Sequence, residues 1–430
     1  MRVTFAALAT RNYRLFATGS LISNVGTWMQ RVAQDWLILT LTASAGALGV
    51  TTGLQFLPIL LFSPLAGVVA DRYPKRVVLT VTQVVLGVTA ATLGVLAVTG
   101  LAQPWHVYLL AFLFGTGAAF DVPARQAFVN EMVGPDRLTN AVALNSASFN
   151  LARMIGPALA GLLIAALGSG VTATGWVILI NATTYAAVVV SLARMRSSEL
   201  TPTVPLARAR GQLREGVRYV RGRPDLLLVM GVVFCAGTFG LNFQMTTALM
   251  ATQVYDKGAG EFGILGSIIA VGSLVGSLLA ARRARSRQRL VVVGAMAFGV
   301  IELIAGLMPT YWTFALILPL CGFAALTVIT AANSFMQMAA APQMRGRVMA
   351  LYLAVFMGGT PIGSVVLGWV AEQFGARWTL IGGGALTALG TLVVTAIFGR
   401  RQGVVLTDSL RPVPSVSVGT GAAVGETVSV

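Results

Sequence analysis

Apolar stretches of membrane-spanning length recur from one end of this chain to the other, separated by short charged segments. An α-helix crosses the roughly 30 Å core of a bilayer with about 20 apolar residues. Only 10% of the 430 residues are charged, whereas a soluble domain carries about 25%. The sequence therefore predicts an all-α polytopic membrane protein. The twelve predicted spans are residues 15–41, 46–70, 76–100, 104–122, 139–168, 172–194, 226–250, 259–281, 290–309, 311–338, 346–371 and 377–398.

The basic residues gather on one side of these spans. With the N-terminus inside the cell, 26 of the 30 Lys and Arg residues fall on the cytoplasmic side. Lys257 and Arg377 fall outside, and Arg31 and Arg153 lie within spans. Because cytoplasmic loops accumulate Lys and Arg, this distribution predicts an even number of spans and two cytoplasmic termini. The net charge of +16 then reflects topology, and no nucleic acid partner is expected.

The longest internal loop, residues 195–225, divides the chain into halves that repeat part of their sequence. A shift of 207 residues pairs Pro135, Ala143, Gly156 and Gly161 with Pro342, Ala350, Gly363 and Gly368. Repeated halves are a common building plan of secondary transporters. The linker helix is expected to lie on the anionic inner leaflet, or else to be a soluble connection. The predicted units are an N-terminal six-helix bundle (1–194), a cytoplasmic basic amphipathic linker (195–225), a C-terminal six-helix bundle (226–400) and a disordered cytoplasmic tail (401–430).

The chain carries little of the machinery that an enzyme needs. It has no G-x-x-x-x-G-K-[ST] phosphate-binding motif, and His106 is its only histidine, so neither ATP hydrolysis nor a His-based triad is expected. Cys235 and Cys321 lie in apolar stretches, which argues against a disulfide or a metal cluster. We therefore expect no enzymatic activity, no cofactor and no metal. Without ATP hydrolysis, we expect an ion gradient to supply the energy for any work that the protein performs.

Some ionisable side chains fall well inside predicted spans. A charge there costs roughly 2.5 to 3.5 kcal/mol and must face protein or water. Arg31 and Asp35 lie one helical turn apart, so either they neutralise each other or Asp35 carries a proton as substrate moves. Arg153 coincides with a backbone loosened by Pro157. Glu302 is a further coupling candidate, with a structural hydrogen bond as its alternative role. The proton-coupling candidates are thus Asp35, Arg31, Arg153 and Glu302.

Uncharged polar and aromatic side chains in the first, seventh and tenth spans are candidates for a substrate path. Each residue alone is weak evidence, because polar side chains also form hydrogen bonds between helices. These candidates are Asn24, Trp28, Gln34, Asn242, Gln244, Asn333 and Gln337.

A cluster of charges follows the second span, in Gly67-Val-Val-Ala-Asp71-Arg72-Tyr-Pro-Lys75-Arg76. This cluster resembles the loop between helices 2 and 3 of major facilitator superfamily transporters. The resemblance implies that the loop latches the cytoplasmic side when the transporter faces outward, with Asp121 as a partner for Arg72 or Arg76. The alternative is that the charges only anchor the loop and fix its orientation. The predicted gate comprises Gly67, Asp71, Arg72, Lys75, Arg76, Asp121 and Arg125.

Further passages resemble one branch of this superfamily, the bacterial exporters related to the enterobactin exporter and the macrolide efflux proteins. The similarity runs through residues 10–400, and its clearest passages are Leu21–Trp36, Asp121–Phe128 and Leu144–Arg153. The segment Gly156-Pro157-x-x-x-Gly161 resembles the helix 5 motif of exporters in the superfamily, although small residues also permit close helix packing.

The resemblance implies two pseudo-symmetric six-helix bundles that rock about a central small-molecule substrate. It further implies proton-driven export of a medium-sized, partly apolar molecule by a monomer in the bacterial cytoplasmic membrane. Two alternatives remain open from the sequence, a proton symporter that imports a nutrient and a membrane sensor or scaffold that transports nothing.

Overall fold

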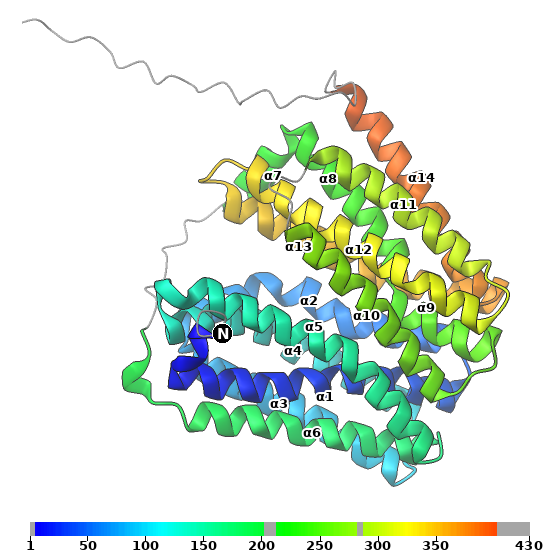
Figure 1. Ribbon diagram of the computed structural model, residues 1–430, viewed down its shortest axis with the longest axis horizontal. Coiled ribbons are helices and arrows are strands. Elements are labelled where there is room, and N and C mark those ends of the chain that lie inside the picture. Colours follow the sequence, from blue (N-terminus) through cyan, green and yellow to red (C-terminus); the bar gives the residue numbers. More distant parts are fainter. Residues whose placement is uncertain (1–4, 202–211, 282–286, 402–430) are drawn as a thin grey trace, which may run out of the picture.

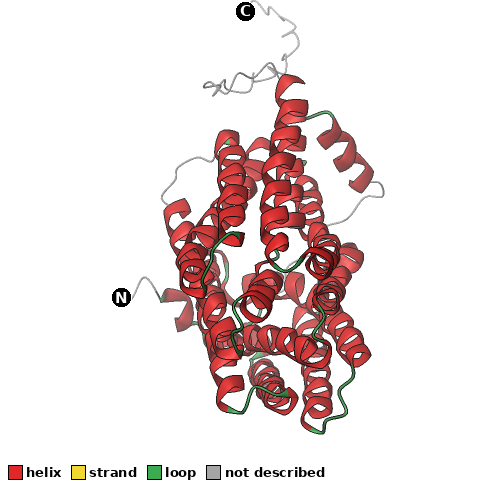
Figure 2. Cartoon of the chain, turned by 90° about the vertical axis from the view of Figure 1, so that its right-hand side faces the viewer, coloured by secondary structure: helices red, strands yellow, loops and turns green. Residues whose placement is uncertain are grey.

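The computed structural model describes residues 5–201, 212–281 and 287–401, which fold into long helices joined by short loops (Figure 1). Figure 2 shows the same helices in a view turned by 90°. In Figure 1 the N-terminal half lies below the C-terminal half. The N-terminal half contains α1 (Arg11–Thr42), α2 (Ala45–Arg72), α3 (Lys75–Val98), α4 (Pro104–Val133), α5 (Pro135–Ala166) and α6 (Val171–Ala193). The C-terminal half contains α8 (Pro224–Cys235), α9 (Phe243–Leu249), α10 (Ala259–Ala281), α11 (Gln288–Gly306), α12 (Tyr311–Ala339), α13 (Arg345–Phe374) and α14 (Arg377–Arg401).

Eleven helical segments of the described residues are long and apolar enough to cross a membrane, by length and composition; α8 and α9 together form one of them. The remaining long helix, α1, has 32 residues. At 1.5 Å per residue this length exceeds the thickness of the hydrocarbon core. The polar residues of α1 make it the least apolar of the long helices. The all-α architecture of twelve spans predicted from the sequence is thus confirmed.

The fourth and fifth helices are longer than the sequence predicts. The sequence predicts that the fourth span ends at residue 122, before Pro123, but α4 continues through that proline to Val133. A proline removes one backbone hydrogen bond, which packing against neighbouring helices can offset. Gly134 is the single residue between α4 and α5, and its φ is 67°. Glycine suits this tight connection because it adopts positive φ at little cost. Pro135 begins α5, where its fixed φ suits the first helical turn.

A short helix, α7 (Gln212–Arg221), lies between the halves in sequence. It packs on α13, where Glu215 and Arg347 form an ion pair with a 2.7 Å N–O distance. Val220 is buried, so the apolar side of α7 contacts protein at that residue. The rest of the predicted linker, residues 202–211, lies outside the described residues, as do residues 402–430 of the predicted tail and residues 282–286 of the basic run.

The seventh span is interrupted twice by π-helical turns, Ala236–Gly240 and Met250–Val254, which flank α9. Helix α13 comes very close to the first turn. A Cβ added at Gly359 would lie 2.5 Å from Oγ1 of Thr238, and one added at Gly363 would overlap the carbonyl oxygen of Thr238. Only residues without side chains allow this approach. The first π-turn of the seventh span is therefore packed directly against α13.

The two halves meet mainly through two helix pairs, α2 with α13 and α5 with α10. A Cβ added at Gly49 would lie 2.4 Å from the backbone oxygen of Ser364, and one added at Gly161 would lie 2.4 Å from that of Ala259. Ser44, which caps α2 by accepting a hydrogen bond from the Ala47 N–H, also donates one to Glu372 of α13. These contacts lie toward the end of the molecule opposite the Asp71 loop. The halves are joined most closely at that end.

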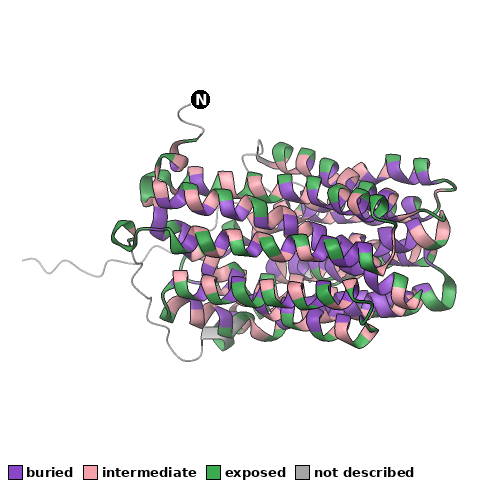
Figure 3. Cartoon of the chain, turned by 90° about the horizontal axis from the view of Figure 1, so that it is seen from below, coloured by how far each residue is buried: buried purple, intermediate pink, exposed green. Residues whose placement is uncertain are grey.

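Burial follows the pattern expected of a protein surrounded by lipid. Figure 3 shows buried residues on the inward faces of the helices and exposed residues on their outer faces. Large apolar side chains are exposed on the outside; Trp312 and Leu316 are 73% and 77% exposed. In a soluble protein such a surface would aggregate, whereas in a bilayer it contacts hydrocarbon.

We expect Gly49→Ala to destabilise the protein by about 1–3 kcal/mol, because the new methyl group overpacks the contact between α2 and α13. Gly382→Ala is the matched control, because a Cβ at this helical glycine meets no atom within 4 Å. Thermal unfolding of the two purified variants in detergent, followed by circular dichroism, measures the difference. Equal melting temperatures would contradict the close approach at Gly49.

Candidate functional site

A cavity of about 240 Å³ lies between the two halves. Its walls come from α1, α2 and α5 of the N-terminal half and from α9, α10, α12 and α13 of the C-terminal half. Most of its lining is apolar and aromatic, as is usual for small-molecule sites. Its charged and larger polar or amphipathic side chains are Trp28, Arg31, Gln55, Arg153, Asn242 and Gln244.

Two arginines of the cavity share one indole ring. The guanidinium carbon of Arg31 lies 4.8 Å from the ring centroid of Trp28 and 5.5 Å from that of Phe56. The guanidinium carbon of Arg153, from α5, lies 5.8 Å from the Trp28 centroid. Cations are attracted to the faces of aromatic rings, most strongly when water is excluded. The aromatic rings therefore hold these charges at the cavity wall.

Asp35 binds across the divide between the halves. It is 2% exposed, and its Oδ2 accepts a hydrogen bond of 2.6 Å from Nε2 of Gln244 in α9. The salt bridge between Arg31 and Asp35 that the sequence allows is not formed; within the described residues no N–O distance of 4.0 Å or less joins them. Arg31 instead turns toward Trp28 and Phe56. The helical spacing permits the pair, but the aromatic rings hold Arg31 and the amide of Gln244 holds Asp35.

Glu302 lies away from the cavity, inside the C-terminal half. It is fully buried, next to Gly240 of the first π-turn and Gly383 of α14. A Cβ at Gly240 would come within 2.8 Å of Oε2 of Glu302, so the glycine makes room for the carboxyl group. Among the described residues, neither carboxyl oxygen of Glu302 has a hydrogen-bond partner. The four coupling candidates therefore divide into Arg31 and Arg153 at the cavity, Asp35 beside it, and Glu302 apart from it.

The substrate-path candidates divide in the same way. Trp28, Asn242 and Gln244 line the cavity. Asn24 and Gln34 of α1 do not, and Gln34 is buried with no partner for its Nε2 among the described residues. Asn333 and Gln337 of α12 also lie outside the lining and are hydrogen-bonded to each other.

The helix 5 motif makes contacts on two sides. A Cβ at Gly156 would lie 2.6 Å from Cβ of Trp28, so this glycine lets α1 approach α5. Gly161 faces Gly263 of α10, and Pro157 lines the cavity. The motif thus sets the distance from α5 to α1 within its own half and to α10 in the other half.

The predicted gate residues make ion pairs within the N-terminal half. Nζ of Lys75 lies 3.1 Å from Oε1 of Glu131, and both side chains are buried. Asp121 pairs with Arg125 at 2.8 Å and accepts further hydrogen bonds from Thr82 and Gln83. In this conformation Asp121 thus pairs with Arg125, and its contact with Arg72 or Arg76 stays a prediction for the outward-facing state. A pairing within one helix, four residues apart, needs no particular rotation of a second helix.

The remaining gate residues lie around the end of α2. Arg76 donates hydrogen bonds to Oγ of Ser197 and to the backbone oxygen of Ala193. Gly67 and Asp71 lie in the last turns of α2, and Arg72 at its end is exposed. The contacts of Lys75, Arg76 and Asp121 thus join α3 to α4 and to the end of α6.

Two residues of the gate region and the cavity were not among the candidates predicted from the sequence. Glu131, the partner of Lys75, was one of several charges near the cytoplasmic end of α4. Gln55 is 6% exposed and lines the cavity from α2. A polar residue inside an otherwise apolar span was the signal that could have found Gln55.

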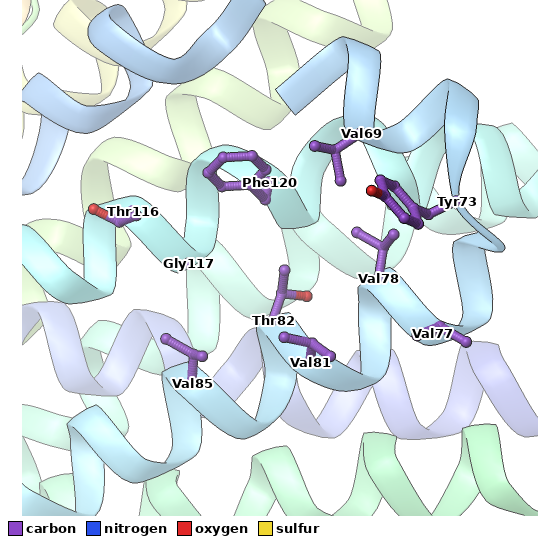
Figure 4. Close-up of a pocket in the computed structure, with 10 residues that line it drawn as sticks. All are labelled: Val69, Tyr73, Val77, Val78, Val81, Thr82, Val85, Thr116, Gly117 and Phe120. Carbon is purple, nitrogen blue, oxygen red and sulfur yellow. The ribbon is translucent and has the colours of Figure 1, made fainter. Parts of the chain in front are cut away.

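A second hollow, of about 320 Å³, lies apart from this polar group, between α2, α3 and α4 (Figure 4). Its lining contains no charged residue and includes Val69, Tyr73, Val81 and Phe120. Val77 and Val81 are more than half exposed. This hollow belongs to the lipid-facing surface and offers no polar group that would orient a substrate beyond hydroxyls.

The sequence matches the family model described as "Transmembrane secretion effector" over residues 2–414. It is 27% identical over 376 residues to the multidrug efflux pump Tap of Mycolicibacterium fortuitum, covering 85% of this chain and 90% of that protein. It is 24% identical over 388 residues to the staphyloferrin A transporter of Staphylococcus aureus, covering 90% and 95%. It is 23% identical over 380 residues to macrolide efflux protein A of Streptococcus pyogenes, covering 86% and 92%.

The fold is also similar to that of solved transporters. A point mutant of the nucleoside transporter NupG superposes with a TM-score of 0.71 at 13% identity, covering 90% of this chain and 100% of that one. At this identity the likeness concerns the fold alone.

We expect Glu131→Ala to cost about 3–5 kcal/mol of stability, because it leaves the ammonium group of Lys75 buried without this carboxylate. Replacing both residues, as Lys75→Met with Glu131→Leu, should recover most of the loss. Glu199→Gln is the control, because the pair of Arg196 and Glu199 is exposed and contributes little. Thermal unfolding in detergent measures the stability of the three variants. A Glu131→Ala variant as stable as the original chain would contradict a buried ion pair between Lys75 and Glu131.

Proposed function

Because this chain belongs to the transmembrane secretion effectors of the major facilitator superfamily, we propose that it exports a small molecule by proton antiport. It is a multi-pass bacterial membrane transporter, and its membership of the superfamily confirms the prediction from the Gly67–Arg76 loop. Its relatives are named for the efflux of drugs and macrolides and for the transport of staphyloferrin A. Export, proton coupling and the residues that perform them are the proposal.

The direction in which the cavity faces follows from the proposed orientation. With both termini cytoplasmic, as the distribution of basic residues predicts, the end joined by Gly49, Gly161 and Glu372 is the outer end. The cavity is then closed toward the outside, and the conformation is the inward-facing one. To reach the outward-facing state, the contacts of α2 with α13 and of α5 with α10 must open, as rocking of two halves about a central site requires.

The observation that carries the proposal is the hydrogen bond between Asp35 and Gln244, which joins the halves beside the cavity. A carboxylate accepts a shorter and stronger hydrogen bond than a neutral carboxylic acid does. As long as Asp35 is ionised, the bond resists separation of the halves. Two events weaken it: protonation of Asp35, and a substrate that takes the side-chain amide of Gln244, which also lines the cavity.

This arrangement has the logic of an antiporter. The carrier that holds neither proton nor substrate is locked, whereas the protonated carrier and the substrate-loaded carrier are free to change conformation. Protons and substrate then move in opposite directions, because each releases the lock on its own leg of the cycle. A symporter would instead need an empty carrier that moves freely. The lock therefore supports antiport over import by symport.

We expect Asp35→Asn to abolish transport driven by a pH gradient while the protein still inserts, because asparagine cannot take up and release the proton. Proteoliposomes with an imposed pH gradient and staphyloferrin A as substrate measure this as accumulation. Downhill exchange of the same substrate should persist. Glu199→Gln is the control for a lost exposed acid.

Unchanged gradient-driven accumulation in Asp35→Asn would exclude Asp35 as the coupling acid. Proton-driven uptake into intact cells, in place of efflux from them, would select the importer.

We expect Gln244→Leu to make the transporter leak protons without substrate, because the ionised, empty carrier loses its lock. A pH-sensitive dye inside proteoliposomes should report faster collapse of an imposed pH gradient, by roughly tenfold if the lock contributes about 1.4 kcal/mol, which lies near the lower end for a hydrogen bond to a charged group. Gln253→Leu is the matched control, because Gln253 lies in the same span and is exposed. A gradient as durable with Gln244→Leu as with the control would show that Gln244 is no lock.

A further inference from the structure

The charge of the cavity lining is entirely positive. Of the side chains that line it, only Arg31 and Arg153 are charged, and no carboxylate is among them. Among the described residues, neither guanidinium forms a salt bridge, and Nε of Arg31 is buried without a hydrogen-bond partner. The nearest acid, Asp35, is hydrogen-bonded to Gln244 and lies outside the lining.

Two like charges on one small wall repel each other and need an opposite charge to offset them. The proximity of Asp35 offsets part of the charge of Arg31. Arg153 has Arg31 as its charged neighbour, and this neighbour adds repulsion. The cavity therefore has a net positive potential, and low-dielectric walls strengthen such a potential.

The surroundings of the two arginines define what else a ligand would meet. Trp28 lies within 6 Å of both guanidinium carbons, and Phe56, Phe243, Phe262 and Phe356 also line the cavity. Planar guanidinium groups bind carboxylates through paired hydrogen bonds, while aromatic walls accept a flat apolar body.

We propose that this cavity selects an anionic substrate, with a carboxylate or similar group bound by Arg31 and Arg153 and an aromatic or apolar body packed on the rings around them. The inference rests on the proposed function, because it names the class of molecule that the exporter carries. An anion also suits export, since a membrane potential that is negative inside favours its outward movement.

Binding of three probes of equal shape tests the proposal. Naphthoate, neutral naphthamide and cationic naphthylmethylammonium are titrated against the full-length protein in lipid nanodiscs, and calorimetry gives the dissociation constants. We expect naphthoate to bind at least tenfold more tightly than naphthamide, and the cation to bind more weakly still. A charge-assisted hydrogen bond is worth about this factor or more.

Variants identify the arginines as the cause. Arg31→Gln and Arg153→Gln should each weaken naphthoate binding by about tenfold or more and leave naphthamide binding nearly unchanged. Arg31→Lys and Arg153→Lys keep the charge and should retain part of the preference, which decides the matter if a glutamine variant fails to fold. Arg194→Gln, at an exposed position, is the matched control.

Equal binding of naphthoate and naphthamide, no binding of naphthoate, or a preference that survives both glutamine variants would each overturn the proposal. Proton-driven export of naphthoate that persists unchanged when Arg31→Gln and Arg153→Gln are combined would also overturn it, while leaving the exporter assignment intact. Conversely, arginine-dependent binding of naphthoate without any proton-driven transport would support the anion site and count against the exporter.

Discussion

The absence of hydrogen-bonding solvent in hydrocarbon governs how this protein places its polar groups. Each one inside a span needs a protein partner or a cavity. Lys75 and Asp121 find partners within the N-terminal half, as does Asn181 through Gln30. Asp35 finds its partner in the other half. At this buried acid, the need for a hydrogen-bond partner also constrains how the two bundles are arranged.

The sequence predicts the membrane-spanning helices more readily than the side-chain contacts between them. Apolar length and the sidedness of Lys and Arg report on insertion, which each span undergoes largely on its own, so twelve spans could be predicted. Partners depend on how each helix is rotated about its axis. The sequence allowed Arg31 to pair with Asp35, and Asp121 with Arg76, but aromatic rings and other polar groups hold all four of these side chains elsewhere. The extension of α4 through Pro123 and the two π-turns left no apolar signature either.

The cavity combines two properties that reinforce each other under the proposed mechanism. Its arginines provide attraction for an anion, and its neighbour Gln244 connects occupancy to the contact between the halves. A molecule large enough to reach both the guanidinium groups and the amide would be bound and would release the lock in a single event. Glu302, sealed within the C-terminal half, stays a predicted second proton site with no contact to this group.

Gln244 lies on a seven-residue helix; two residues separate one π-turn from the start of this helix, and the other π-turn follows it directly. A π-turn holds one residue more than an α-turn. If such a turn migrated along the span, the segment it passed would rotate by about 100° about its axis, the angle that one residue subtends in an α-helix. A screw motion of this kind would carry the amide away from Asp35 without unwinding the span. The two π-turns would thus let the seventh span rotate at the position where Gln244 joins the two bundles.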